Sequence, residues 1–365
     1  MIIQQIKIYK YSIPMHPFTI ATGTMDFAQN TLIQIFTDSN ITGIGECSAF
    51  PMIVGETQNT CYEMAKDFAT LWKGNDALNI AERMADLHLF TAGNSTIKSA
   101  FDMALYDIAA KHAGLPLYKF LGGTKKEMLT DITVGIGLPN IMAQQAKAFV
   151  NNGASILKIK LGKDIATDIE RIKTIRDAVG NTVEIRIDAN QGWSFEDAKT
   201  CLVELGKYNI AFCEQPMRTY DDAHLPELIK ISPIKIMADE SVYNHHDAKK
   251  IIKDNACDYI NIKFAKSGGI LEAKKIIDVA TANNIYCMMG GMLESRVALS
   301  AFAAFAAANT QIIFYDMDTC MLGHKVDPVL GGVTYNGYTV QLTDGIGIGA
   351  SVDESYLASY ESVMV

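Results

Sequence analysis

Asp188, Glu214 and Asp239 each stand at the end of an apolar, β-type run of residues. They are 26 and 25 residues apart, about the length of one strand, one helix and two short loops. Three successive βα units would therefore deliver one carboxylate each to the same edge of a parallel sheet. Buried acids must be paired or bound to a metal. A set of oxygen ligands without histidine or thiolate indicates a hard cation, so we expect these three residues to bind Mg²⁺. For any single acid, the alternative is a helix N-cap or a surface loop residue.

Lysines from two other predicted strands flank these acids. Lys158 and Lys160 are two residues apart, so both side chains point to the same side of their strand. Lys263 belongs to a strand that lies nearly opposite in a closed eight-stranded sheet. We predict that Lys160 and Lys263 are general bases facing opposite sides of one substrate carbon, and the alternative is a structural ion pair with the acids. The charges of Lys158 and of a metal would help by disfavouring the charged form of a neighbouring lysine base.

A second pair of acids, Asp316 and Asp318, ends the last β-type run and shares one face of it. Two acids beyond the metal need a cationic partner, which a substrate could supply. The alternative is that they cap a helix after the strand.

These residues require a scaffold that brings many strand ends together. The sequence alternates strand-like and helical patterns after about residue 125, and amphipathic helices such as the one containing Ile169 and Ile172 separate the strands. Eight strands at about 25-residue spacing predict a (β/α)₈ barrel, in which active sites lie at the carboxyl ends of the strands. A doubly wound sheet is the alternative, but no nucleotide-binding fingerprint supports it. The predicted strands are 131–136, 155–161, 183–188, 210–214, 234–239, 258–264, 285–290 and 312–318.

The N-terminal region is predicted to be an α+β unit. Residues 2–13 and 31–37 have strand patterns, and the intervening segment 14–30 is predicted to be a loop that either tucks apolar side chains away or covers a small-molecule site. Helical periodicity extends from Thr57 to about Leu121. We expect three parts: an N-terminal capping domain (1–125), a catalytic barrel (126–325) and a tail that returns to the capping domain (326–365).

Composition limits the function. The chain has 365 residues and a net charge of −9, without a basic stripe, which argues against nucleic acid as a partner. Seven scattered cysteines without a Cys-x-x-Cys motif indicate a reduced, cytoplasmic protein. No signal peptide is evident, and the most apolar stretch, 297–308, is too short to span a bilayer, so no membrane partner is expected.

Five motifs in order resemble the enolase superfamily, and within it the muconate-lactonizing-enzyme subgroup. The motifs are Lys158-Ile159-Lys160, Asp188-x-Asn190, Glu214-Gln215-Pro216, Asp239-Glu240-Ser241 and Lys263-x-x-Lys266-x-Gly268-Gly269. The resemblance covers essentially the whole chain. It implies Mg²⁺ bound by Asp188, Glu214 and Asp239, bases at Lys160 and Lys263, and a role for Lys158 in holding a substrate carboxylate.

Asp316-Met317-Asp318 resembles the Asp-x-Asp motif with which dipeptide epimerases of this subgroup bind the free α-ammonium of a dipeptide. The resemblance implies an isomerase that inverts the α-carbon of the C-terminal residue through an enediolate, with Thr133, Gly291 and Leu293 lining the substrate pocket. Other activities stay open: N-acylamino-acid racemase, o-succinylbenzoate synthase, cycloisomerase, or a metal-binding barrel without turnover. Barrel enzymes of this kind often self-associate into homo-oligomers, but no surface stripe in the sequence marks an interface.

One departure from the resemblance bears on specificity. Relatives that act on Ala-Glu carry an arginine in the N-terminal loop, which pairs with the glutamate side chain. Residues 17–25 contain no Arg or Lys, and Gly23 stands near the place of that arginine. Since an unpaired buried glutamate would be costly, we expect neutral, small or apolar dipeptides as substrates.

Overall fold

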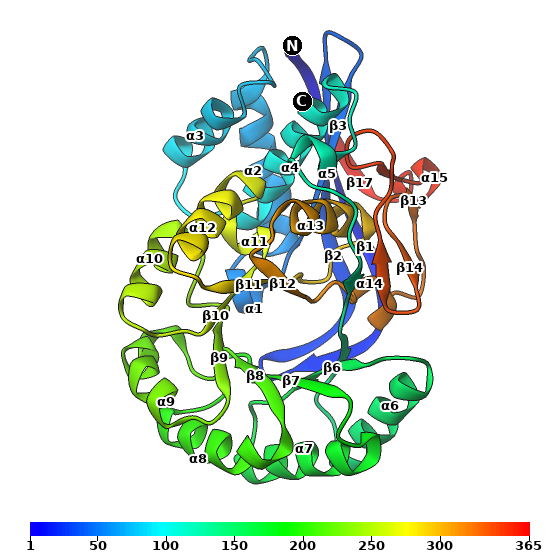
Figure 1. Cartoon of the computed structure of the whole chain (residues 1–365). Helices are drawn as coiled ribbons and strands as arrows, with labels where there is room; N and C mark the ends of the chain where they lie inside the picture. Colours follow the sequence, from blue (N-terminus) through cyan, green and yellow to red (C-terminus); the bar gives the residue numbers. More distant parts are fainter.

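A computed structural model describes residues 1–365, and its largest sheet contains eight parallel strands that curl into a barrel (Figure 1). All eight predicted strands are confirmed, seven of them with shorter bounds and β8 with the predicted bounds. They follow one another around the sheet in chain order from β5 to β12. The strands are β5 (Ile132–Val134), β6 (Ile156–Lys160), β7 (Glu184–Asp188), β8 (Ile210–Glu214), β9 (Lys235–Ala238), β10 (Tyr259–Ile262), β11 (Tyr286–Met289) and β12 (Ile312–Tyr315).

Helices surround this sheet on the outside (Figure 1). They bury apolar residues in the core, and in α13 ten consecutive residues from Val297 to Ala306 are buried. The α-helices are α6 (Pro139–Asn151), α7 (Ile165–Val179), α8 (Phe195–Leu205), α9 (Leu225–Ile231), α10 (His245–Lys253), α11 (Phe264–Ser267), α12 (Ile270–Ala282), α13 (Arg296–Ala308) and α14 (Thr319–Leu322). Two 3₁₀ helices are η1 (Gly206–Tyr208) and η2 (Thr219–His224).

The first and last strands of the barrel, β5 and β12, are not joined by a backbone ladder. Isolated hydrogen bonds connect their chain segments instead. The amide of Asp131 donates to the carbonyl of Tyr315 over 3.2 Å. The amide of Thr133 donates to Oδ2 of Asp318 over 2.7 Å, and the amide of Met317 donates to Thr130. We call this junction the seam.

The N-terminal region forms an antiparallel sheet in the order β17-β1-β2-β3, packed against helices. Its last strand comes from the end of the chain, where Met364 pairs with Lys7, so the two termini lie close together (Figure 1). The elements are β1 (Ile3–Ile20), β2 (Gly23–Thr37), β3 (Thr42–Ser48), α1 (Pro51–Val54), α2 (Gln58–Trp72), α3 (Ile80–Phe90), α4 (Ser95–His112), α5 (Leu117–Phe120) and β17 (Glu361–Met364).

The predicted loop at 14–30 is wrong. Strand β1 continues to Ile20 and β2 begins at Gly23, which makes one long hairpin that reaches from this sheet to the barrel (Figure 1). A register shift between Pro14 and Phe18 accommodates the residues that resembled strand breakers, and the pairing then resumes with Phe18 opposite Met25. The hairpin tip touches the barrel, because the amide of Ile136 donates to the carbonyl of Thr19 over 2.8 Å.

The remaining segment after the barrel consists of short strands. Strand β15 pairs with β14 and with β4, which immediately precedes the barrel, while β13 pairs with β16. These elements are β4 (Met128–Leu129), β13 (Val329–Gly331), β14 (Thr334–Asn336), β15 (Thr339–Gln341), β16 (Ala350–Val352) and α15 (Glu354–Leu357).

Two buried carboxylates of the N-terminal region cap helices of the barrel. Glu46 on β3 accepts hydrogen bonds from the amides of Ser295 and Ala298 at the start of α13, and also from Tyr11 and Asn30. Asp102 on α4 accepts hydrogen bonds from the first amides of α12. A carboxylate at a helix N-terminus satisfies free amides and interacts favourably with the helix dipole. The two regions are thus joined by charge-assisted hydrogen bonds as well as by apolar contacts.

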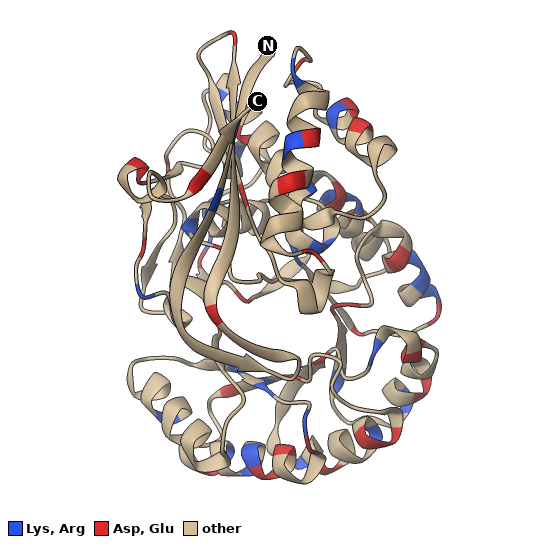
Figure 2. Cartoon of the chain, turned by 180° about the vertical axis from the view of Figure 1, so that it is seen from behind, with Lys and Arg blue, Asp and Glu red and all other residues tan.

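Lys and Arg are interspersed with Asp and Glu on the outer helices (Figure 2). None of the helices combines the length and the apolar composition needed to cross a membrane.

We predict that Glu46→Ala lowers the free energy of unfolding by about 3 kcal/mol or more, because buried donors on Tyr11, Asn30 and α13 lose their acceptor. Urea denaturation followed by circular dichroism would measure the loss. Glu204→Ala, which removes a half-exposed acid on α8, is the control and should leave the midpoint unchanged. Equal effects of the two substitutions would contradict the role of Glu46.

Candidate active site

The structure brings the three predicted metal-binding carboxylates to neighbouring strand ends. Asp188 ends β7 and Glu214 ends β8, and the two residues are partners in the parallel pairing of these strands. Asp239 directly follows β9. All three side chains are fully buried. Each strand is short and apolar below its acid, so the backbone ladder fixes the point at which the carboxylate emerges.

The two predicted bases lie on either side of this group. Lys160 ends β6 and pairs in register with Asp188, and its Nζ lies 2.6 Å from Oδ2 of Asp188. Lys263 follows β10, four strands away around the sheet, and its Nζ lies 2.8 Å from Oδ2 of Asp239 and 3.9 Å from Oε1 of Glu214. The structure therefore places one lysine at each end of the row of carboxylates.

The protein groups alone do not give Lys263 the lowered pKa expected of a base. Burial lowers the pKa of Lys263, but the facing carboxylates of Asp239 and Glu214 outweigh burial and raise that pKa above its ordinary value. A cation bound to the same carboxylates would weaken this effect, because it would compete with the ammonium for their charge.

Lys158 lies at the centre of the acids. Its Nζ is 2.7 Å from Glu214, 2.7 Å from Asp316 and 3.3 Å from Asp188. Burial lowers the pKa of Lys158, but these acids together raise it well above the ordinary value. Lys158 is therefore a fixed positive charge between the predicted metal site and the Asp316–Asp318 pair.

Lys266 is a further buried cation, to which the sequence analysis gave no role. Its Nζ lies 2.5 Å from Oδ1 of Asp239, and it donates to the carbonyls of Asp239, Val242 and Asn261. The sequence signal that could have identified Lys266 is its position three residues after Lys263, in the motif that ends in Gly268-Gly269. Lys266 ties one oxygen of Asp239 to the protein and leaves Oδ2 facing Lys263.

The site carries more negative than positive charge. When all of them are ionised, six buried carboxylates and four buried lysines leave an excess of two negative charges. Burial beside Asp188 raises the pKa of Glu214 to about 7, and burial beside Asp239 raises the pKa of Glu240 to about 8. The groups counted are Asp188, Glu214, Asp239, Glu240, Asp316 and Asp318, with Lys158, Lys160, Lys263 and Lys266.

Unpartnered oxygens show that these residues fit a divalent cation. Both carboxylate oxygens of Glu240 are buried without a hydrogen bond, and so are the side-chain oxygens of Asn190 and Asn261. Oε2 of Glu214 and both oxygens of Asp239 are bound only by lysine ammoniums, at 2.5–2.8 Å. Buried polar atoms without partners are costly. A hard cation among these oxygens would satisfy them and would balance the excess charge.

The predicted substrate-binding residues belong to β5 and to the segments that follow β11 and β12. Thr133 is on β5, and its amide binds Asp318, while Asp316 contacts Lys158. Gly291 and Leu293 lie in the loop between β11 and α13, where a Cβ at Gly291 would lie 3.1 Å from Oε2 of Glu294. A side chain at this position would require Glu294 to shift by a few tenths of an ångström.

The hairpin tip contributes an apolar border. A Cβ on Gly23 would lie 2.6 Å from Sδ of Met52 on α1, so Met52 fills the space beside this glycine. A Cβ on Gly162, in the loop after β6, would lie 3.2 Å from the side chain of Ala21. The hairpin therefore rests on the loop that follows Lys160.

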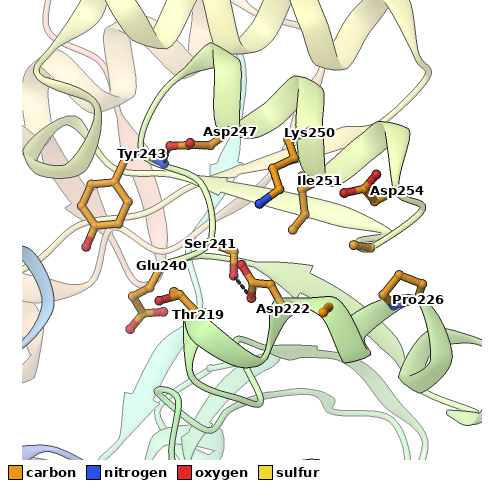
Figure 3. Close-up of a pocket in the computed structure, with 12 residues that line it drawn as sticks. Thr219, Asp222, Pro226, Glu240, Ser241, Tyr243, Asp247, Lys250, Ile251 and Asp254 are labelled. Carbon is orange, nitrogen blue, oxygen red and sulfur yellow. Dashed lines mark hydrogen bonds between the residues drawn. The ribbon is translucent and has the colours of Figure 1, made fainter.

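One cleft of the surface does not contain the two lysines. It has a volume of about 650 Å³ and lies between η2 and α10, beside the loop after β9 (Figure 3). Ser241 donates a hydrogen bond to Asp222 at its inner wall, over 2.7 Å (Figure 3). Because Lys160 and Lys263 do not line this cleft, we assign the chemistry to the barrel opening.

Comparison with known proteins agrees with this arrangement. Residues 3–122 match the family model "Mandelate racemase / muconate lactonizing enzyme, N-terminal domain", and residues 141–356 match the model "Enolase C-terminal domain-like". A D-Ala-D/L-Ala epimerase from Cytophaga hutchinsonii is 40% identical, with 100% of both chains covered. A hydrophobic dipeptide epimerase from Enterococcus faecalis is 37% identical and covers 96% of this chain and 99% of its own.

Among solved structures, the dipeptide epimerase from Cytophaga hutchinsonii complexed with Mg and the dipeptide D-Ala-L-Val superposes with a TM-score of 0.98. It is 41% identical and covers 100% of both chains. The sequence and the fold thus agree over the full length, and the chain belongs to the mandelate racemase/muconate lactonizing enzyme family of the enolase superfamily.

Proposed function

We propose that this protein is a Mg²⁺-dependent dipeptide epimerase that inverts the α-carbon of the C-terminal residue. The observation that carries the proposal is the placement of Lys160 and Lys263 on opposite sides of a buried row of carboxylates. Relatives that are epimerases acting on dipeptides support it. Asp188, Glu214 and Asp239 would hold the metal. When bound there, Mg²⁺ supplies positive charge that stabilises a substrate carboxylate as the neighbouring carbon loses its proton.

The two lysines act as the base and the acid of one proton transfer. One lysine, as the free amine, takes the α-proton from its face of the carbon, and the other, as the ammonium, donates a proton to the opposite face. The roles exchange with the configuration of the substrate. Lys158 holds the substrate carboxylate, and the hairpin tip and the loop after β11 exclude water from the carbon between the bases.

The Asp316–Asp318 pair favours a dipeptide over other substrates of the family. Both acids are buried and offer charge to a substrate ammonium, which an acylated amino acid or a cyclic diacid does not have. The apolar contact between Gly23 and Met52 supports neutral or apolar dipeptides rather than Ala-Glu, because no cation of the hairpin tip could pair with a glutamate side chain. All seven cysteines are free thiols, which fits a reducing, cytoplasmic setting.

Metal binding is tested by Glu214→Gln, which keeps the shape of the side chain but removes its charge. We expect Mg²⁺ affinity, measured by titration calorimetry, to fall at least about 100-fold. Glu294→Gln is the matched control, because Glu294 is an equally buried acid with the amide of Met292 as its partner, and its Mg²⁺ affinity should stay at the wild-type value. An unchanged affinity in Glu214→Gln would place the metal elsewhere.

The two-base assignment is tested by hydrogen exchange. With Mg²⁺ in D₂O, the wild type should incorporate deuterium at the α-carbon of the C-terminal residue from either diastereomer. Lys160→Ala and Lys263→Ala should each lose epimerisation by about 10²- to 10⁴-fold, and each should retain exchange with a different diastereomer only. Mass spectrometry and NMR would measure both. Full epimerisation by either variant would remove that lysine from the mechanism.

Substrate preference is tested with a dipeptide library. A buried, unpaired glutamate side chain costs about 3 kcal/mol, so kcat/KM for Ala-Ala or Ala-Val should exceed that for Ala-Glu by roughly 100-fold. Gly23→Arg, which requires the flexible Met52 to move, should narrow this ratio. Preferential turnover of Ala-Glu by the wild type would show that another residue pairs with the substrate side chain.

A further inference from the structure

Three aspartates meet at the seam of the barrel. Asp131 precedes β5, whereas Asp316 and Asp318 follow β12. One carboxylate oxygen of each lies within 4.8 Å of the other two, and all three side chains are buried. The family resemblance assigned Asp316 and Asp318 to the α-ammonium of a dipeptide, but it assigned no role to Asp131.

Each aspartate uses one oxygen, Oδ2, to bind the protein. Asp131 accepts from Arg186 over 2.9 Å, Asp318 accepts from the amide of Thr133 over 2.7 Å, and Lys158 donates to Asp316 over 2.7 Å. Asp318 also accepts a hydrogen bond from the side chain of Thr133. The Oδ1 atom of Asp131, in contrast, is completely buried and has no partner at all.

Asp131 is held rigidly in this arrangement. Its partner Arg186 has its guanidinium 5.5 Å from the ring centre of Phe212 and 5.1 Å from that of Phe314, and it also binds Glu184 over 2.8 Å. Contact with both rings leaves the guanidinium little freedom to turn. The free oxygen of Asp131 is therefore not the result of a mobile side chain.

A primary ammonium matches this group of acceptors. It has three N–H donors in tetrahedral directions, and charge-assisted hydrogen bonds of about 2.8 Å place three acceptor oxygens about 4.6 Å apart. A second divalent metal fits less well, because Mg²⁺ binds its oxygens at about 2.0–2.1 Å and would lie next to the Lys158 ammonium, which already contacts Asp316.

We propose that Asp131 is the third acceptor for the α-ammonium of the dipeptide, so that Asp131, Asp316 and Asp318 each receive one of its N–H groups. This inference rests on the proposed dipeptide substrate. It explains why a third buried acid stands beside the pair, and it makes the site specific for an unsubstituted N-terminus: an acylated nitrogen has one N–H and no charge, and a methylated ammonium lacks one donor.

The test compares Asp131→Asn with the wild type in the Mg²⁺-loaded enzyme. Asparagine keeps an oxygen for Arg186 but removes the charge. We expect KM for Ala-Ala to rise about 10- to 150-fold with kcat nearly unchanged, because the ammonium binds equally in the ground and transition states. The affinity of Asp131→Asn for the Ala-Ala analogue in which a hydrogen atom replaces the α-ammonium group should not fall below that of the wild type. Glu184→Gln, which alters the other partner of Arg186, is the control and should leave KM unchanged.

Binding of N-methylated Ala-Ala to the wild type provides a second test. This test can be made even if Asp131→Asn does not fold. We expect the wild type to bind it at least about 10-fold more weakly than Ala-Ala, and Asp131→Asn to discriminate less. Equal binding of the two dipeptides by the wild type would overturn the proposal, since one N–H would then be unused.

Two other outcomes separate this inference from the proposed function. If the wild type exchanges dipeptides but Asp131→Asn has wild-type KM, only the role of Asp131 is wrong. If calorimetry shows one fewer Mg²⁺ bound by Asp131→Asn, the three aspartates form a metal site and the ammonium proposal is overturned. Absence of any binding or exchange of dipeptides would instead refute the proposed function.

Discussion

Crowding of like charges at the barrel opening is the constraint on which the site depends. Six carboxylates are buried there because the strands that carry them end at the same edge, and water cannot screen their repulsion. Each buried lysine relieves part of this repulsion, and Lys266 is bound by carbonyls on all sides and cannot leave. Lys160 contacts Asp188 alone, and Lys263 contacts Asp239 and, more distantly, Glu214, so a competing cation could replace either ammonium. The excess of negative charge destabilises the site when no cation is bound. It also makes the site favour cations as ligands.

The barrel opening also depends on the region that covers it. Glu46 and Asp102 bind the first amides of α13 and α12, which are the helices that follow the loop with Gly291 and the segment with Lys263. The hairpin tip rests on the loop after Lys160. Contacts from the N-terminal region thus reach both of the proposed bases through their neighbouring loops, so the spacing of the two lysines depends on how the regions are joined.

Sequence reasoning found what short-range patterns encode. Acids at 25-residue intervals located Asp188, Glu214 and Asp239 at strand ends, and eight apolar runs predicted the barrel strands. The hairpin at 14–30 was missed because this glycine-containing segment was interpreted as a loop, whereas its two halves pair with each other, as Phe18 does with Met25. Asp131 and Glu240 were missed for a different reason. These residues stand out because they have buried oxygens without a hydrogen-bond partner. A local sequence pattern does not show which buried acceptors will lack a donor in the folded protein.

The seam between β5 and β12 has a consequence for motion. Every other neighbouring pair of barrel strands is held by a ladder, but here closure depends on a few bonds, including one to the side chain of Asp318. A ligand that bridges the two segments would reinforce the weakest joint of the cylinder. Ligand binding and local opening of the seam are then thermodynamically linked. A bound ligand should slow hydrogen exchange of the Thr133 amide with solvent, and a change that weakens the seam should speed the release of the ligand.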